Sequence, residues 1–151
     1  MPISLTVPAE YGYVLLTATG ATFLNFYHSS LVGKFRKASG IKYPNAYATP
    51  EQAATSKDAY KFNCAQRAHQ NFLESLPFYM TLLVISGLKY PVPAAIAGVA
   101  WQVSRVMYAN GYVYSTKENG AGRYNGVWGY GPLVGLIGMS IWTSVSMVME
   151  T

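Results

Sequence analysis

Four long stretches of this chain are almost free of charged residues, and they restrict the folds that it can adopt. They cover residues 11–33, 67–88, 93–114 and 127–149, and the second begins with a polar turn. A helix needs about 20 mostly apolar residues to cross a membrane. Only 11% of the residues are charged, against about 25% in a typical soluble domain. The sequence therefore predicts an all-α fold, an integral membrane four-helix bundle that fills residues 1–151 as one domain.

The first stretch is expected to be a retained helix and not a cleaved signal peptide. It is too long, it lacks a basic n-region, and no small-x-small cleavage site precedes a polar mature chain. The single cysteine excludes an internal disulfide framework.

The net charge of +5 is concentrated in two of the connections between these stretches. The basic residues of the segments 34–61 and 115–126 are Lys34, Arg36, Lys37, Lys42, Lys57, Lys61, Lys117 and Arg123. The remaining connection carries only Lys89, and the ends carry Glu10 and Glu150. The positive-inside rule then places the loops 34–61 and 115–126 in the cytoplasm, with both termini on the opposite side. Attraction to anionic lipid headgroups explains the charge more simply than nucleic acid does, so no nucleic-acid partner is expected.

The segment before the second stretch has the signature of a helix start. Thr49 can cap, Pro50 suits the first helical position, and Gln52 completes a capping box. The second helix is therefore predicted to begin near residue 50 and to project into the cytoplasm.

Several glycines lie in the last third of the chain. The loop 115–126 is polar and glycine-rich, so we expect it to be mobile. Gly131 and Gly135 have the spacing that permits close contact between membrane helices.

The motif FNCAQRAHQNFLE, residues 62–74, carries the most informative polar residues. Arg67, Asn71 and Glu74 are spaced i, i+4, i+7 and so share one helical face. Charged groups at the edge of the hydrocarbon layer are costly unless they have partners or a function. The motif indicates a polar ligand held at the membrane surface, although a structural Arg67–Glu74 ion pair between helices is an alternative.

The third stretch offers a second polar face at the same depth. Its members are Trp101, Arg105, Tyr108 and Tyr112. Arg105 lies deep in the stretch and needs an acidic or carbonyl partner. Antiparallel packing would bring Tyr108 and Tyr112 beside the motif, and Arg123 and Arg36 are within reach of that place. The tyrosines fit an interfacial aromatic belt equally well, and Arg36 also fits a simple topology signal.

Other chemistries are poorly supported. His28, His69 and Cys64 share no metal-ligand spacing, so no metal site is predicted. No dinucleotide-binding loop, phosphate-binding loop or serine-hydrolase motif occurs.

The two helical motifs resemble those of the membrane-associated proteins in eicosanoid and glutathione metabolism (MAPEG). The likeness rests on FNCAQRAHQNFLE, on the R-x-x-Y-x-x-G-Y pattern from residue 105, and on KxRK at residues 34–37. The likeness covers nearly the whole chain, and the chain resembles in particular the third type of microsomal glutathione transferase. Ser75 departs from the Tyr of leukotriene-forming relatives, and His69 from their Gln.

The resemblance implies a homotrimer that binds glutathione between protomers near the cytoplasmic face. The implied activity is a membrane-bound glutathione transferase that conjugates glutathione to lipophilic electrophiles, reduces lipid hydroperoxides, or both. The implied location is the endoplasmic reticulum or nuclear envelope, or the mitochondrial outer membrane. A non-catalytic lipid-binding or scaffold protein of the same fold is the alternative.

The resemblance also implies roles for individual residues. Glutathione would be bound by Arg67, Asn71, Glu74, Tyr108 and Tyr112, with Arg36 and His69 from an adjacent protomer. Arg123 would be the catalytic residue that stabilises the thiolate, with Lys117 as its rival in the same loop. The charges of these residues are complementary to those of glutathione, which carries two carboxylates and one ammonium. A guanidinium also favours the thiolate form of a thiol with a pKa of about 8.5.

Overall fold

The computed structural model describes residues 6–149, and these residues are mostly helical, with no strand among them. The elements are α1 (Tyr11–Ser39), α2 (Pro50–Thr55), α3 (Lys57–Lys89), α4 (Pro91–Tyr114), the 3-10 helix η1 (Glu118–Gly129) and α5 (Tyr130–Met149). The prediction of an all-α fold is confirmed for this part of the chain. Glu150 lies outside the described residues.

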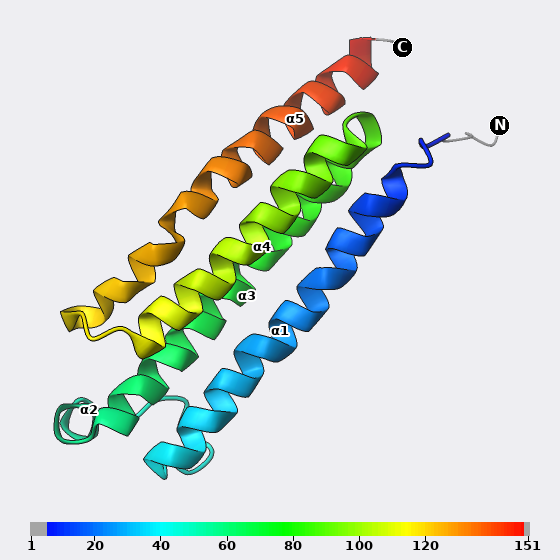
Figure 1. Ribbon diagram of the computed structural model, residues 1–151. Helices are drawn as coiled ribbons and strands as arrows, with labels where there is room; N and C mark the ends of the chain where they lie inside the picture. The colour runs from blue at the N-terminus through cyan, green and yellow to red at the C-terminus, as the bar shows by residue number, and fades with distance from the viewer. Residues whose placement is uncertain (1–5, 150–151) are drawn as a thin grey trace.

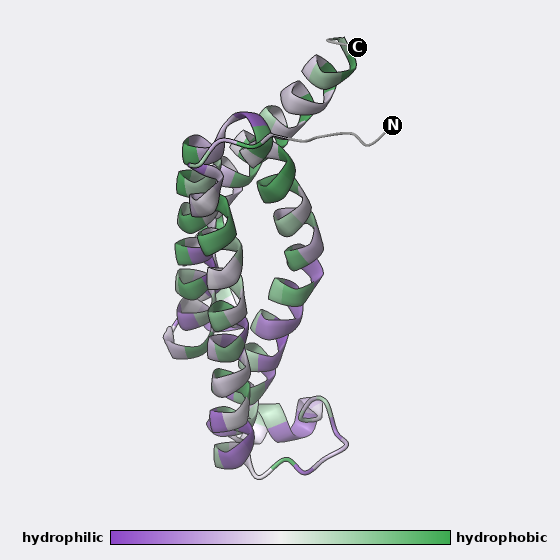
Figure 2. Cartoon of the chain, turned by 90° about the vertical axis from the view of Figure 1, so that its right-hand side faces the viewer, coloured by the Kyte–Doolittle hydropathy of each residue, from purple (hydrophilic) through white to green (hydrophobic). Residues whose placement is uncertain are grey.

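The long helices α1, α3, α4 and α5 lie side by side in an elongated bundle (Figure 1). α3 and α4 contact each other, and each of them also contacts α1 and α5. Figure 1 shows the first and last described residues near one end of the bundle and α2 at the other. In Figure 2, hydrophilic residues gather at the end that carries α2, while the long helices are largely hydrophobic. Both basic connections thus lie at one end, as the charge pattern predicted.

Two helical segments in residues 6–149 are long and apolar enough to cross a membrane. They are α3, with 33 residues, and the segment Glu118–Met149, with 32 residues; each contains an 18-residue window with a mean hydropathy of 1.3 and 1.6, respectively. α1 and α4, with 29 and 24 residues, also have sufficient length, since each residue adds about 1.5 Å. That α1 and α4 cross as well stays a prediction.

The outer face of α1 is strongly apolar. Leu16, Phe23 and Phe26 are between 66% and 70% exposed. A large exposed apolar surface is unusual on a soluble monomer and is typical of a face that meets lipid or another protein. The surface therefore agrees with a membrane setting.

The helix start near residue 50 is present, but the helix is interrupted. Thr49 and Gln52 form the predicted capping box at Pro50. The backbone then becomes extended at Ser56, which ends α2 and caps α3 by accepting a hydrogen bond from the Ala59 N–H. The predicted single helix is therefore two helices, because Ser56 provides a second start.

The glycine-rich connection after α4 is helical and tightly packed, contrary to the loose loop that composition suggested. A Cβ on Gly122 would lie 2.0 Å from the carbonyl oxygen of Gly111, and one on Gly129 would lie 1.9 Å from Ser104 Oγ. η1 and α4 therefore meet along a seam of glycines, which we call the glycine seam: Gly111, Gly120, Gly122, Gly126 and Gly129.

The glycines of α5 behave differently. No atom of the described chain lies within 4 Å of a Cβ built on Gly131 or Gly135. The close helix contact expected from their spacing is thus not made within the chain.

Candidate functional site

A cavity of about 460 Å³ lies at the α2 end of the bundle, where α3, α4 and η1 meet the α1–α2 connection. We call it the arginine cavity. Its walls are Tyr47, Ala53, Tyr60, Asn63, Cys64, Arg67, Tyr112 and Asn119. Two residues of the predicted site, Arg67 and Tyr112, therefore face one space from two different helices.

The polar stripe of α3 forms an exposed ion pair within one helix. Arg67 Nη1 lies 3.3 Å from Glu74 Oε1, and the two side chains are 46% and 50% exposed. The alternative of an ion pair between helices is therefore wrong. Half-exposed partners exchange readily with a bound ligand, because such pairs contribute little to stability.

Asn71 faces inward and provides the partner that Arg105 needs. Arg105 Nη2 donates a hydrogen bond to Asn71 Oδ1 at 2.5 Å. Arg105 is only 8% exposed, and its guanidinium lies 4.3 Å from the centre of the Tyr108 ring. An amide carbonyl and an aromatic face thus replace the carboxylate that a buried cation usually needs.

Tyr108, Tyr112 and Arg123 continue this line toward η1. The Tyr108 and Tyr112 rings are in edge contact, with centroids 5.8 Å apart. The Arg123 guanidinium lies 5.7 Å from the Tyr112 ring centre. Arg67 and Arg123 are both close enough to act electrostatically on the phenols of Tyr108 and Tyr112.

Backbone carbonyls fix the position of Arg123. Its Nη1 donates to the carbonyl oxygens of Asn119 at 2.9 Å and Gly120 at 3.0 Å, and its Nη2 lies 3.0 Å from the Tyr124 hydroxyl. The rival residue Lys117 lines a different cavity with Lys57 and Lys61.

The structure therefore links six of the predicted side chains into one connected polar group and leaves two outside it. The linked residues are Arg67, Asn71, Glu74, Tyr108, Tyr112 and Arg123. His69 turns toward α1, where Nε2 lies 3.0 Å from Asn25 Oδ1. Its assignment to a neighbouring protomer's site stays a prediction.

Arg36 holds the α1–α2 connection. Its Nη1 donates to the Asn45 carbonyl at 2.8 Å, and its guanidinium lies 4.1 Å from the Tyr43 ring centre and 4.6 Å from that of Phe62. Within one chain it does not join the polar group, so its predicted contact with a neighbour's ligand is likewise untested.

Sequence reasoning missed several residues that shape the cavity. Asn63 accepts a hydrogen bond from Ala48 N at 2.8 Å and donates one to Ala48 O at 3.0 Å, which ties the connection to α3. The Tyr47 hydroxyl donates to Gln70 Oε1 at 2.6 Å. Tyr47 lies in an irregular connection, which has no periodic signal, whereas Asn63 precedes Arg67 by four residues and continues the stripe of α3, a spacing that could have identified it. Cys64 is 4% exposed and also lines the cavity.

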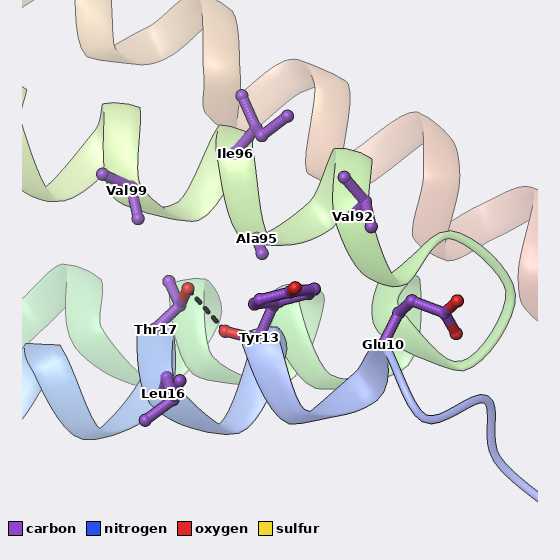
Figure 3. Close-up of a pocket in the computed structure, with 8 residues that line it drawn as sticks. All are labelled: Glu10, Tyr13, Leu16, Thr17, Val92, Ala95, Ile96 and Val99. Atoms are coloured by element: carbon purple, nitrogen blue, oxygen red, sulfur yellow. Dashed lines mark hydrogen bonds between the residues drawn. The ribbon is translucent and has the colours of Figure 1, made fainter.

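An apolar cavity lies far from this site. It has a volume of about 720 Å³ and is formed by Glu10 and residues of α1 and α4. Figure 3 shows this groove between α1 and α4, with Tyr13 of α1 lying toward Ala95 and Val92 of α4. Val92 and Tyr112 are 20 residues apart on α4, or about 30 Å along a helix. This apolar groove is thus separate from the arginine cavity.

No group of three or more His, Cys, Asp or Glu residues suited to hold a metal ion occurs in the part of the chain that the structure describes. The donors of the arginine cavity are cationic and phenolic, which suits an anionic organic ligand.

Comparison with known families gives a match over most of the chain. The model of the MAPEG family matches residues 14–142. The matched segment contains both helical motifs and all residues that line the arginine cavity.

Proposed function

The chain belongs to the MAPEG family, and on this premise we propose that it is a membrane-bound glutathione transferase. It conjugates glutathione to lipophilic electrophiles, reduces lipid hydroperoxides with glutathione, or both. The finer likeness, to the third type of microsomal glutathione transferase, is part of the proposal.

The observation that carries the proposal is that Arg67 and Tyr112 line one cavity and that Arg123 lies beside Tyr112. Arg67 and Tyr112 line it, and Arg123 lies 5.7 Å from the Tyr112 ring centre. Cationic groups from two helical elements suit a ligand with two carboxylates, while Glu74 offers a carboxylate for its ammonium. A lipid scaffold protein has no need for this set of groups.

In the proposed mechanism Arg123 is the catalytic residue. Its guanidinium favours ionisation of the glutathione thiol, because the thiolate gains an opposite charge in a partly desolvated place. In conjugation the sulfur forms a bond to the electrophilic carbon, and the displaced or opened group takes up a proton. In peroxide reduction two glutathione molecules and one hydroperoxide give an alcohol, water and glutathione disulfide. Arg67, Asn71, Glu74, Tyr108 and Tyr112 position the tripeptide.

An apolar groove gives the lipophilic substrate a route to this place. A cavity of about 620 Å³ between α3 and α5 is lined by apolar residues that include Phe78, Leu133 and Ile137. It begins at Ser75, the neighbour of Glu74. A lipid that moves laterally from the hydrocarbon layer would thus arrive beside the polar stripe of α3.

The proposal includes a cytoplasmic active site and a homotrimer. The α2 end, with its cluster of basic residues, faces the cytoplasm by the positive-inside rule. The open glycine face of α5 and the apolar outer face of α1 are surfaces that a second protomer can cover. The endoplasmic reticulum or nuclear envelope is the proposed location.

The test is an assay of purified protein in detergent micelles with glutathione and either a lipophilic electrophile or a lipid hydroperoxide. Thiolate absorbance on addition of glutathione reports binding and ionisation together. We expect Arg123→Ala to lose the thiolate signal and Glu74→Ala to bind glutathione more weakly. Full activity in both variants contradicts the mechanism. Absence of glutathione binding to the wild type, measured by calorimetry, favours a non-catalytic lipid-binding protein.

A further inference from the structure

A second cavity at the α2 end is lined by lysines and is not used by the proposed function. Its volume is about 460 Å³. We call it the lysine cavity, and its walls are Lys57, Tyr60, Lys61, Val113, Tyr114, Ser115, Thr116, Lys117, Glu118 and Asn119. Three cations from two segments distant in sequence thus face one space that contains a single carboxylate.

A fourth lysine adjoins this space from α1. Lys34 Nζ lies 3.1 Å from the Tyr114 hydroxyl and 5.2 Å from the Tyr114 ring centre. Lys61 Nζ lies 5.9 Å from the same ring centre. Both ammonium groups also lie within 6 Å of the Phe35 ring centre, at 5.3 and 5.8 Å. Positive charges from α1, α3 and the start of η1 therefore lie around Tyr114.

These lysines have no carboxylate partner. Among residues 6–149 the single ion pair with a nitrogen–oxygen distance within 4.0 Å is Arg67–Glu74. Like charges repel, and aromatic faces offset only part of that repulsion. A bound anion would remove the remainder, and the positive end of the α3 macrodipole, at Lys57, adds to its attraction.

The depth of the cavity indicates which anion is available. Lys34 directly follows the apolar stretch that ends at Gly33, and Tyr114 ends the stretch that begins at Pro93. Both residues therefore lie at the level of the headgroups if α1 and α4 cross the bilayer. Compact ammonium groups from several sides can surround a tetrahedral phosphate as point charges.

We propose that the lysine cavity is a binding site for the phosphate group of an anionic phospholipid in the cytoplasmic leaflet. The headgroup lies between the first turns of α3 and the start of η1, with Lys57, Lys61 and Lys117 around its phosphate. Lys34 and Tyr114 border it on the side of α1. The site adjoins the arginine cavity, with which it shares Tyr60 and Asn119, and does not depend on the proposed activity.

The test uses the full chain in micelles of a non-ionic detergent at about 0.15 M salt, where diffuse attraction is screened beyond about 8 Å. Native mass spectrometry measures binding of phosphatidic acid, with phosphatidylcholine as the zwitterionic comparison of zero net charge. The variant is Lys57→Gln with Lys61→Gln. The matched control is Lys37→Gln with Lys42→Gln, which removes the same charge from exposed residues at the same end that do not line the cavity.

We expect the cavity variant to bind phosphatidic acid about tenfold more weakly, given the contribution of each lysine near a membrane surface. The control variant keeps wild-type affinity. Lys57→Arg with Lys61→Arg retains the charge and most of the binding, which separates lost charge from misfolding. Equal weakening in the cavity and control variants, or equal binding of phosphatidylcholine, overturns the proposal.

Competition by inorganic phosphate distinguishes the source of the anion. If inorganic phosphate at millimolar concentration leaves bound phosphatidic acid in place, the site is a lipid site as proposed. If it displaces the lipid completely and binds alone with equal strength, the ligand is a soluble phosphate and the lipid assignment is overturned.

Discussion

The arginine cavity and the lysine cavity have similar volumes, lie at the same end of the bundle, and share Tyr60 and Asn119 in their walls. Their cations are held very differently. Arg67 pairs with Glu74, and Arg123 donates to backbone carbonyls. Lys57, Lys61 and Lys117 have no carboxylate within 4.0 Å in residues 6–149.

The difference separates two ways to attract an anion. Guanidinium groups held by partners present a fixed geometry, which a reaction at one sulfur atom requires. Ammonium groups on flexible lysine stems can adapt to an anion whose exact orientation is unimportant. The following variants test this contrast, from the largest expected effect to the smallest.

Removal of Arg123, the proposed catalytic residue, has the largest expected effect. Arg123→Ala lowers kcat/KM for glutathione conjugation by about a hundredfold, in the range seen when one group that stabilises a developing anion is removed. Lys117→Ala is the matched control, because it removes a cation of the same connection that lines the lysine cavity. Steady-state kinetics would contradict the contrast if Lys117→Ala caused the greater loss.

The glycine seam carries η1, and with it Arg123. Gly122→Ala places a Cβ 2.0 Å from the Gly111 carbonyl oxygen, so we expect a loss of about 2.5 kcal/mol of stability from overpacking. Gly131→Ala meets no atom within 4 Å and should be neutral or slightly stabilising. Denaturant unfolding in micelles measures both, and similar losses would show that the seam is not rigid.

Asn71→Ala removes the acceptor of a buried charged group. Arg105 then lacks its hydrogen bond, and we expect a loss of about 2 kcal/mol of unfolding free energy. Lys61→Ala, on the side of the lysine cavity, breaks no hydrogen bond that the structure records and should stay within about 0.5 kcal/mol of the wild type. An equal loss in both variants would contradict the contrast between arginines with fixed partners and lysines without a carboxylate partner.

The smallest expected effect on stability is that of Glu74→Gln. The Arg67–Glu74 pair is about half exposed, so we expect a loss of about 0.5 kcal/mol that fades in high salt. A thermal melt at two salt concentrations measures it. A loss of several kcal/mol, independent of salt, would mean that the pair is structural and not held ready for a ligand.

Local periodicity was sufficient to predict the faces of the two motif helices. Arg67, Asn71 and Glu74 share a stripe because helical spacing is a property of the sequence alone. The partner of Arg105 was predictable only as a class of group, since its identity depends on how α3 and α4 are rotated against each other. The amide of Asn71 fills that role.

Three features of the fold were not predicted from the sequence. Ser56 fits a helix interior as well as a cap, so the break between α2 and α3 was missed. The glycines of residues 115–126 suggested mobility, although their lack of a side chain permits close packing of η1 on α4. The Arg36 side chain is held by the α1–α2 connection. The path of this irregular segment has no periodic pattern in the sequence from which it could be predicted.

The glycine seam also has a consequence for the range of sequences that can encode this protein. Contact between two backbones leaves no volume that a neighbouring side chain could vacate, so compensation by a second mutation is blocked. In a library of random substitutions, Gly111 and Gly122 should accept glycine alone. Tyr124 and Trp128, exposed on the same short helix, should tolerate many residues. The position of the Arg123 guanidinium thus depends on the lack of side chains at Gly111 and Gly122.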